Sequence, residues 1–153
     1  MELFFNRELS EEVINTIATA DRTQMGFHTD NEDVTPVVES AKVRALNGSL
    51  VVGYHKHCVY FLTDYLPGVL LFDSIRGKDA SMFDYVKGSK LLLEELRNTT
   101  KIHKLITRTP YKELLRLQKK IGFTLEGTHL EEYLLKDGSY ADVYTFGYIL
   151  RRD

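Results

Sequence analysis

Apolar residues recur along the chain at spacings typical of strands and of helices, and residues 102–127 combine the two. Residues 102–107 form a short, partly apolar run that is compatible with a strand. Thr109 and Pro110 then predict a helix N-terminus, because threonine can cap it and proline lacks an N–H that would be unsatisfied there. Apolar residues at helical spacing continue to Gly122, where the helix should end and another strand begin. This stretch therefore predicts a strand–helix–strand unit in a sheet covered by helices.

The N-terminal part predicts one strand and two helices. Residues 3–5 are an apolar run that can form a first strand, and Ser10 can cap a helix with glutamates in its first turn. Residues 21–33 are polar and favour a loop or a weak helix. Thr35 and Pro36 then predict the start of a second, short helix by the same capping argument.

The middle of the chain predicts a series of strands. Asn47 and Gly48 join two alternating runs and are the strongest hairpin signal in the chain, so a strand is expected on each side of them. Residues 50–54 have the small, apolar composition of a buried strand. Residues 58–62 and 69–75 are two further apolar runs, separated by turn residues.

Helical spacing returns over residues 79–98, and the end of the chain predicts a strand pair around residues 136–138. Together these elements indicate an α/β (α+β) fold with a mixed sheet of six or seven strands and about four helices. The length of 153 residues fits a single domain over residues 1–153.

Composition narrows the class of protein. The formal net charge is −2 and the pI is about 6.2, which argues against a broad nucleic-acid or acidic-lipid surface. The single cysteine, Cys58, excludes an internal disulfide framework and suits a reducing cytoplasm. No apolar stretch approaches the roughly 20 residues of a membrane span, and the first residues lack the basic start of a secretory signal. We therefore expect a soluble, cytoplasmic domain with no membrane partner.

Three segments carry a resemblance to a known family: KKIGF at the end of the helix before Gly122, LEG just after it, and KDGSYADVYTFGYIL near the end of the chain. The chain resembles a GCN5-related N-acetyltransferase (GNAT), especially the ribosomal-protein and N-terminal acetyltransferase branch. The resemblance covers roughly the last 70 residues by motif and the first 80 by pattern only. It implies a GNAT-like fold, acetyl-CoA as cofactor and an amine acceptor, either a small molecule or a protein.

In this family the cofactor pyrophosphate meets backbone N–H groups where the third helix begins, at a motif of Arg or Gln, two residues, Gly, one residue, and Gly or Ala. Aligning DYVKGSKLLL with this motif places Gly88 on its last position, and Val86 and Phe83 on the two earlier ones. Helical spacing from Met82 onward could also carry the helix through Gly88. The cofactor-binding residues that this alignment implies are Val86, Lys87, Gly88, Ser89 and Lys90, with the backbone of Phe72, Ser74 and Ile75 on the strand beside the thioester.

Nearby cations offer a second way to hold phosphates. Arg76, Lys78, Lys87 and Lys90 could act as point charges, or they could form an ordinary solvated rim.

The catalytic candidates are Asp73 and Tyr111. Asp73 lies between Phe72 and Ser74 on an apolar strand, where burial would raise its pKa and suit it to act as a general base, although it could also be a cap or turn residue. The family uses a tyrosine on the fourth helix to protonate the leaving thiolate, but the resemblance puts Gln118 at that position, and glutamine cannot donate a proton. Tyr111 could substitute for it or could simply pack.

His55 and His57 are alternative bases. With Cys58 they also suggest a metal site, but only the two histidines share a strand face and the sequence contains no second ligand cluster. We therefore expect no metal.

Two functions remain open. The first is an acyl-CoA-dependent N-acyltransferase that moves an acetyl group to an amine. The second is a non-catalytic GNAT-like binding or assembly protein with a protein partner, in the host cytoplasm or in a virion, because small internal or head-assembly proteins of short-tailed phages resemble this chain. Exposed strand edges would make a homodimer possible under either hypothesis.

Overall fold

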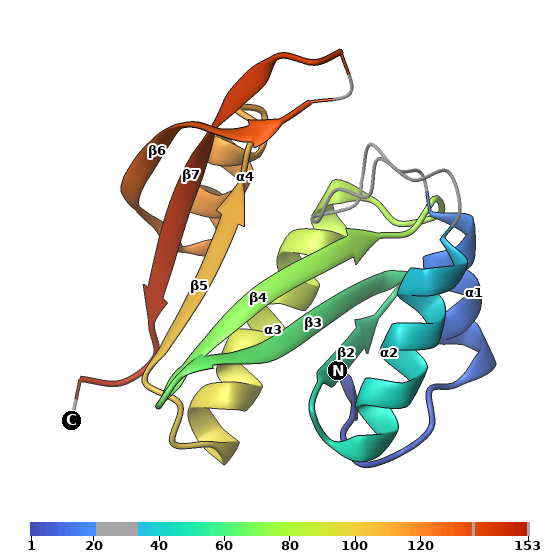
Figure 1. The fold of residues 1–153 in the computed structure, drawn as a ribbon. Helices are drawn as coiled ribbons and strands as arrows, with labels where there is room; N and C mark the ends of the chain where they lie inside the picture. Colours follow the sequence, from blue (N-terminus) through green and yellow to red (C-terminus); the bar gives the residue numbers. More distant parts are fainter. Residues whose placement is uncertain (21–33, 136, 153) are drawn as a thin grey trace.

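The computed structural model describes residues 1–20, 34–135 and 137–152 (Figure 1). Within them, one seven-stranded sheet has the order β1-β2-β3-β4-β5-β7-β6. The strands are β1 (Glu2–Phe4), β2 (Val51–His55), β3 (Cys58–Leu66), β4 (Val69–Arg76), β5 (Lys104–Thr109), β6 (Thr124–Leu134) and β7 (Tyr140–Ile149). The helices are α1 (Glu11–Thr19), α2 (Thr35–Asn47), α3 (Met82–Thr99) and α4 (Leu114–Ile121). The predicted mixed sheet and its helices are confirmed.

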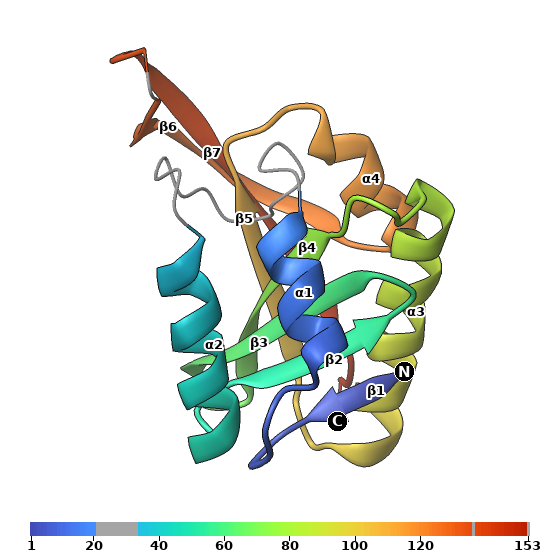
Figure 2. The same cartoon turned by 90° about the vertical axis from the view of Figure 1, so that its right-hand side faces the viewer.

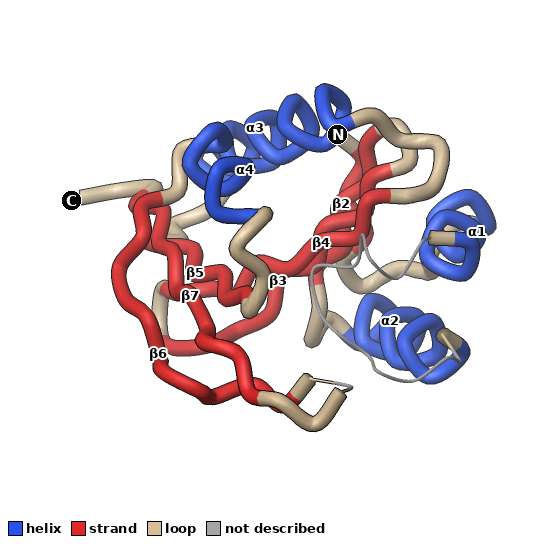
Figure 3. The backbone as a smooth tube through the Cα atoms, turned by 90° about the horizontal axis from the view of Figure 1, so that it is seen from above, coloured by secondary structure: helices blue, strands red, loops and turns tan. Residues whose placement is uncertain are grey.

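Helices cover both faces of the sheet. Figures 2 and 3 show α1 and α2 on one face, over the half of the sheet that contains β2 to β4, and α3 and α4 on the other. Side chains of β3 alternate between the two cores: Tyr60 and Leu62 pack with residues of α3, and Val59 and Phe61 pack with residues of α1 and α2. Within the described residues, no helix is long and apolar enough to cross a membrane.

The predicted hairpin at Asn47 and Gly48 is wrong. The run before Gly48 belongs to α2, which is longer than expected because its buried residues recur at helical spacing, as Val38, Ala41 and Ala45. Gly48 adopts a φ of 79°, and its N–H donates to the carbonyl oxygen of Arg44. Gly48 therefore ends the helix in a left-handed conformation, which a glycine in a hairpin turn would also adopt.

The predicted start of the last helix is also wrong. Thr109 is the final residue of β5, and its hydroxyl accepts a hydrogen bond of 3.1 Å from the backbone N–H of Tyr111. A short turn follows, so that α4 begins only at Leu114. The predicted end at Gly122 is confirmed, since Gly122 takes a φ of 120° and β6 begins two residues later.

Strands β4 and β5 are the only parallel neighbours in this sheet. Their register pairs Val69 with Lys104, Leu70 with Leu105 and Leu71 with Ile106, and then stops. β4 nevertheless continues to Arg76 alongside β3, while β5 continues to Thr109 alongside β7. The two strands therefore diverge in the middle of the sheet, as Figure 1 shows.

Candidate active site

The divergence leaves part of β4 without a strand on one side. Beyond Leu71, the residues of β4 pair with β3 but not with β5. Alternate residues of an extended strand direct their N–H and C=O groups to the same edge, so this part of β4 presents main-chain donors and acceptors toward the opening. Phe72, Ser74 and Ile75, which the sequence indicated as backbone contacts for a cofactor, all lie on this part of the strand.

Asp73 lies on the same part of β4. Its register partner is Phe61 on β3, which places its side chain on the face covered by α1 and α2. Burial raises the pKa of the Asp73 carboxyl from 3.8 to about 6. A carboxylate with this pKa is largely ionised at neutral pH, yet it holds a proton more tightly than a solvated aspartate, which suits a general base.

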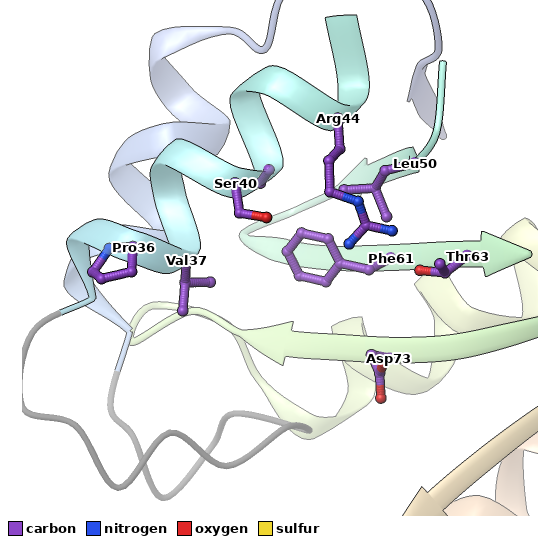
Figure 4. Close-up of a pocket in the computed structure, with 9 residues that line it drawn as sticks. Pro36, Val37, Ser40, Arg44, Leu50, Phe61, Thr63 and Asp73 are labelled. Carbon is purple, nitrogen blue, oxygen red and sulfur yellow. The ribbon is translucent and has the colours of Figure 1, made fainter. Parts of the chain in front are cut away.

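Asp73 lines a pocket of about 340 Å³ between α2 and the sheet (Figure 4). The sheet side is formed by Asp73 with Phe61 and Thr63 of β3, and Arg44 extends from α2 toward β3 beside the ring of Phe61. The other lining residues are Pro36, Val37, Ser40, Ala41 and Leu50. The pocket therefore combines an apolar wall with one acidic and one basic side chain, as small-molecule sites often do.

The N-terminus of α3 is closed by its own side chains. The backbone N–H of Asp84 donates to the Ser81 hydroxyl at 3.0 Å, and the backbone N–H of Ser81 donates to the Asp84 carboxylate at 3.3 Å. The hydrogen bond from the Ser81 hydroxyl, at 2.8 Å, is the main reason that the pKa of Asp84 is lowered. A carboxylate thus occupies the helix terminus at which a phosphate would otherwise be attracted.

The structure also changes the alignment of the pyrophosphate motif. Because α3 begins at Met82, the residues that lead into it are 76–81, and these place Arg76 at the Arg or Gln position. Asp79 and Ser81 then stand at the two glycine positions. The first motif residue is therefore retained in this register, while the two small residues that would let a phosphate approach the backbone are not.

Gly88 and Ser89 lie in the interior of α3, where both are buried against the sheet. A Cβ at Gly88 would overlap the hydroxyl oxygen of Tyr60. The Tyr60 and Ser89 hydroxyls each donate to the carbonyl oxygen of Tyr85 at 2.8 Å, and the Tyr85 hydroxyl lies 2.6 Å from the Ser74 hydroxyl. This part of α3 therefore packs on β3 and β4 through a buried polar network.

The neighbouring residues of α3 have different surroundings. Val86 packs partly buried against the same core, and Lys87 is exposed. Lys90 lines a separate groove with Arg97 and Tyr148, away from the residues around Asp73. The structure therefore does not bring residues 86–90 together at a helix N-terminus.

Tyr111 and Gln118 lie on the other side of the opening. Tyr111 is partly buried in the turn between β5 and α4. Gln118 is only 4% exposed, and its Oε1 atom has no hydrogen-bond partner among the described residues. An amide in this position can accept or donate a hydrogen bond but cannot protonate a leaving group.

His55, His57 and Cys58 have different surroundings, and the buried Nε2 atom of His55 has no hydrogen-bond partner among the described residues. The Nδ1 atom of His57 lies 3.4 Å from the Tyr54 hydroxyl, which donates to Glu12 at 2.9 Å. Burial raises the pKa of the Cys58 thiol to about 11, so that it is protonated at neutral pH. Within the described part of the chain, no group of three or more histidine, cysteine or acidic residues is placed to hold a metal ion.

By sequence, the chain matches no protein-family model and no curated protein. Its structure is similar to a spermidine N-acetyltransferase from Vibrio cholerae solved with CoA and spermine, with a TM-score of 0.70 and 16% identity over 97% of this chain and 95% of the other. It is equally similar to a GNAT-family acetyltransferase from Bacillus anthracis, with a TM-score of 0.70 and 13% identity over 99% and 97% of the two chains. The chain therefore has the GNAT fold along nearly its whole length, in agreement with the resemblance of its C-terminal motifs.

Sequence analysis missed two features of the site. Arg44 was assigned to a strand, in which it would have faced solvent, whereas Val37, Ser40 and Arg44 share one face of α2 at helical spacing. The capping box was detectable as a serine followed three residues later by an aspartate before an apolar run.

Proposed function

We propose that this protein is an N-acetyltransferase that moves an acetyl group from acetyl-CoA to an amine, with Asp73 as the general base. The observation that carries the proposal is the divergence of β4 from β5 beyond Leu71, together with the position of Asp73 on the diverging strand. The opening offers main-chain groups to an extended ligand, and the pocket beside it holds a carboxylate whose pKa is about 6.

The chemistry requires a proton acceptor near the amine. Acetyl-CoA supplies the acetyl group as a thioester. As the amine nitrogen forms the C–N bond and the C–S bond breaks, Asp73 takes the proton that the nitrogen loses. The sulfur leaves with the electron pair and takes its proton from Tyr111 or from solvent, because Gln118 cannot supply one.

The residues of this chain fit such a cofactor in part. The open edge of β4, in the part of the strand that contains Phe72, Ser74 and Ile75, would hold the pantetheine arm through the main-chain groups that alternate residues direct toward it. Lys87, Lys78 and Arg76 would hold the phosphates as point charges, since the capping box occupies the N-terminus of α3. We therefore expect acetyl-CoA to bind more weakly here than at an uncapped helix terminus.

Calorimetry with millimolar acetyl-CoA tests this proposal on the native protein and on the variant Asp84→Asn. The substitution removes the negative charge at the helix terminus, so it should tighten binding by several-fold at low salt. Asp64→Asn, which changes an exposed aspartate of β3, is the matched control and should leave binding unchanged. Absence of heat with both the native protein and Asp84→Asn would exclude the proposal.

A second candidate function is favoured by the capping box itself. A carboxylate at the N-terminus of α3 and a glutamine at position 118 are what a GNAT-like domain would carry if it bound a protein partner instead of catalysing transfer. An assembly factor, including one of phage origin, would have these properties. Single-turnover acetylation of an amine library that is abolished by Asp73→Asn would remove this candidate.

A further inference from the structure

Arg44 and Asp73 line the same pocket but do not neutralise each other. Arg44 forms no ion pair with any described carboxylate, and the one hydrogen bond that its side chain makes to the described residues is a long contact of 3.5 Å from Nη2 to the carbonyl oxygen of Ser49. Asp73 likewise forms no ion pair within the described residues, and burial is the cause of its raised pKa. Two opposite charges therefore line one pocket, and neither has a counter-ion among the described residues.

The wall between these charges is largely apolar. Val37 lies on α2, Leu50 directly precedes β2 and Phe61 lies on β3, with Ser40 of α2 and Thr63 of β3 also in the lining. A volume of about 340 Å³ suits a small organic molecule. A ligand that matches this lining has an ammonium group at one end, an anionic group at the other and a short apolar body between them.

We propose that the acceptor is a small primary amine that also carries an oxyanion, a carboxylate or a phosphate, which Arg44 binds while Asp73 faces the amine. A guanidinium presents parallel N–H donors that match the two oxygens of such a group. This inference rests on the proposed function for the reaction, but it concerns the pocket, which can be tested without acetyl-CoA.

The same geometry disfavours a polycation. Asp73 is the only acidic residue among the described residues that line the pocket, and a second ammonium group would meet the like charge of Arg44. The spermidine N-acetyltransferase with the same fold was solved with spermine. We therefore expect this chain to differ from that enzyme in its acceptor.

The first test is direct binding to the protein alone. Calorimetry compares 5-aminopentanoate with butylamine, which differ only by the terminal carboxylate, and phosphoethanolamine with ethanolamine, which differ only by the phosphate. We expect the anionic member of at least one pair to bind about tenfold tighter or more, and the preferred pair identifies the oxyanion. Equal binding within both pairs, or no binding of any probe at the highest concentration used, would overturn the inference.

Variants of α2 assign the effect to Arg44. Arg44→Met roughly keeps the length of the side chain and removes its charge. It should abolish the preference for the anionic member of each pair and leave the affinity for the amine without an anionic group within about twofold. Lys42→Met removes an exposed cation from another face of the same helix. It should change neither the preference for the anionic amine nor the affinity for the amine without an anionic group. A preference that survives in Arg44→Met would contradict the assignment.

A transfer assay separates this inference from the proposed function. If acetyl-CoA binds and CoA is released with spermidine or butylamine but not with either anionic amine, the proposed function stands and the inference fails. If the anionic probes bind in an Arg44-dependent way but acetyl-CoA does not bind, the inference about the pocket stands and the proposed function fails.

Discussion

Replacement of Asp73 by asparagine should make the fold more stable at neutral pH while it removes the general base. Asp73 is partly buried on β4, and burial raises the pKa of its carboxyl from 3.8 to about 6. The folded protein therefore binds this proton more tightly than the unfolded chain does. Between about pH 4 and pH 6 the folded state holds more protons, so the free energy of unfolding falls as the pH rises through this window.

The size of the effect follows from the two pKa values. Each pH unit between them corresponds to about 1.4 kcal/mol, so ionised Asp73 costs the fold up to about 3 kcal/mol at pH 8. Asparagine has no charge to desolvate, although its amide is also polar and loses hydration. We therefore expect Asp73→Asn to gain about 1–3 kcal/mol at pH 8, which is roughly 2–10 °C in Tm for a domain of this size.

Urea unfolding at pH 4 and pH 8 measures this change. The gain from Asp73→Asn should be present at pH 8 and shrink to about 0.5 kcal/mol or less at pH 4, where the carboxyl is protonated in the folded state and about 40% protonated in the unfolded chain. Asp64→Asn is the control, because Asp64 is exposed on the adjacent strand. A loss of stability at pH 8, or a gain that is the same at both pH values, would refute the argument that Asp73 is a desolvated, unpaired carboxylate.

Three further changes test the packing around the site by urea unfolding. Gln118→Met removes a buried oxygen that has no described partner and should stabilise the fold by about 1 kcal/mol; destabilisation would mean that the oxygen is hydrogen-bonded. Gly88→Ala should lower the free energy of unfolding by about 2 kcal/mol because its methyl group would overlap the Tyr60 hydroxyl, despite the helix propensity of alanine. This loss should be smaller in a Tyr60→Phe background, and an equal loss in both backgrounds would contradict the contact. Lys56 and His57 both have positive φ in the hairpin turn, so the double change Lys56→Asn, His57→Gly should gain about 1 kcal/mol, whereas a loss would show that the native side chains stabilise the turn.

The mixed sheet and the C-terminal half of the chain could be predicted from the sequence. In these parts the local signals, hydrophobic spacing and turn residues, agree with the tertiary structure. The strand–helix–strand unit around α4 and the helix stop at Gly122 depend on spacing and on one glycine, and both are found. Asn47 and Gly48 misled because a left-handed glycine, such as Gly48, ends a helix as readily as it turns a hairpin. Only the burial of Val38, Ala41 and Ala45 on one side of α2 distinguishes the end of a helix from a hairpin turn at this position.

The residues of the site were less predictable than the fold, because their positions depend on which segments are helical and on how these helices pack on the sheet. The motif alignment placed the pyrophosphate motif on Gly88, and the helix that the spacing predicted from Met82 onward does run through this glycine, which is buried against Tyr60. Asp73 was identifiable as a candidate because an aspartate in an apolar strand is unusual in itself. Its neighbour in the pocket, Arg44, could not be recognised until α2 was known to be a helix packed over β3.

The divergence of β4 from β5 is the feature on which the proposed function depends most directly. Hydrogen–deuterium exchange of backbone amides in residues 72–76, with and without saturating acetyl-CoA, tests whether a ligand occupies that edge. We predict that acetyl-CoA slows exchange within this segment, and that exchange in β1 is unaffected. Unchanged exchange in residues 72–76 under conditions where calorimetry shows binding would contradict the account, because the cofactor would then lie elsewhere on the molecule.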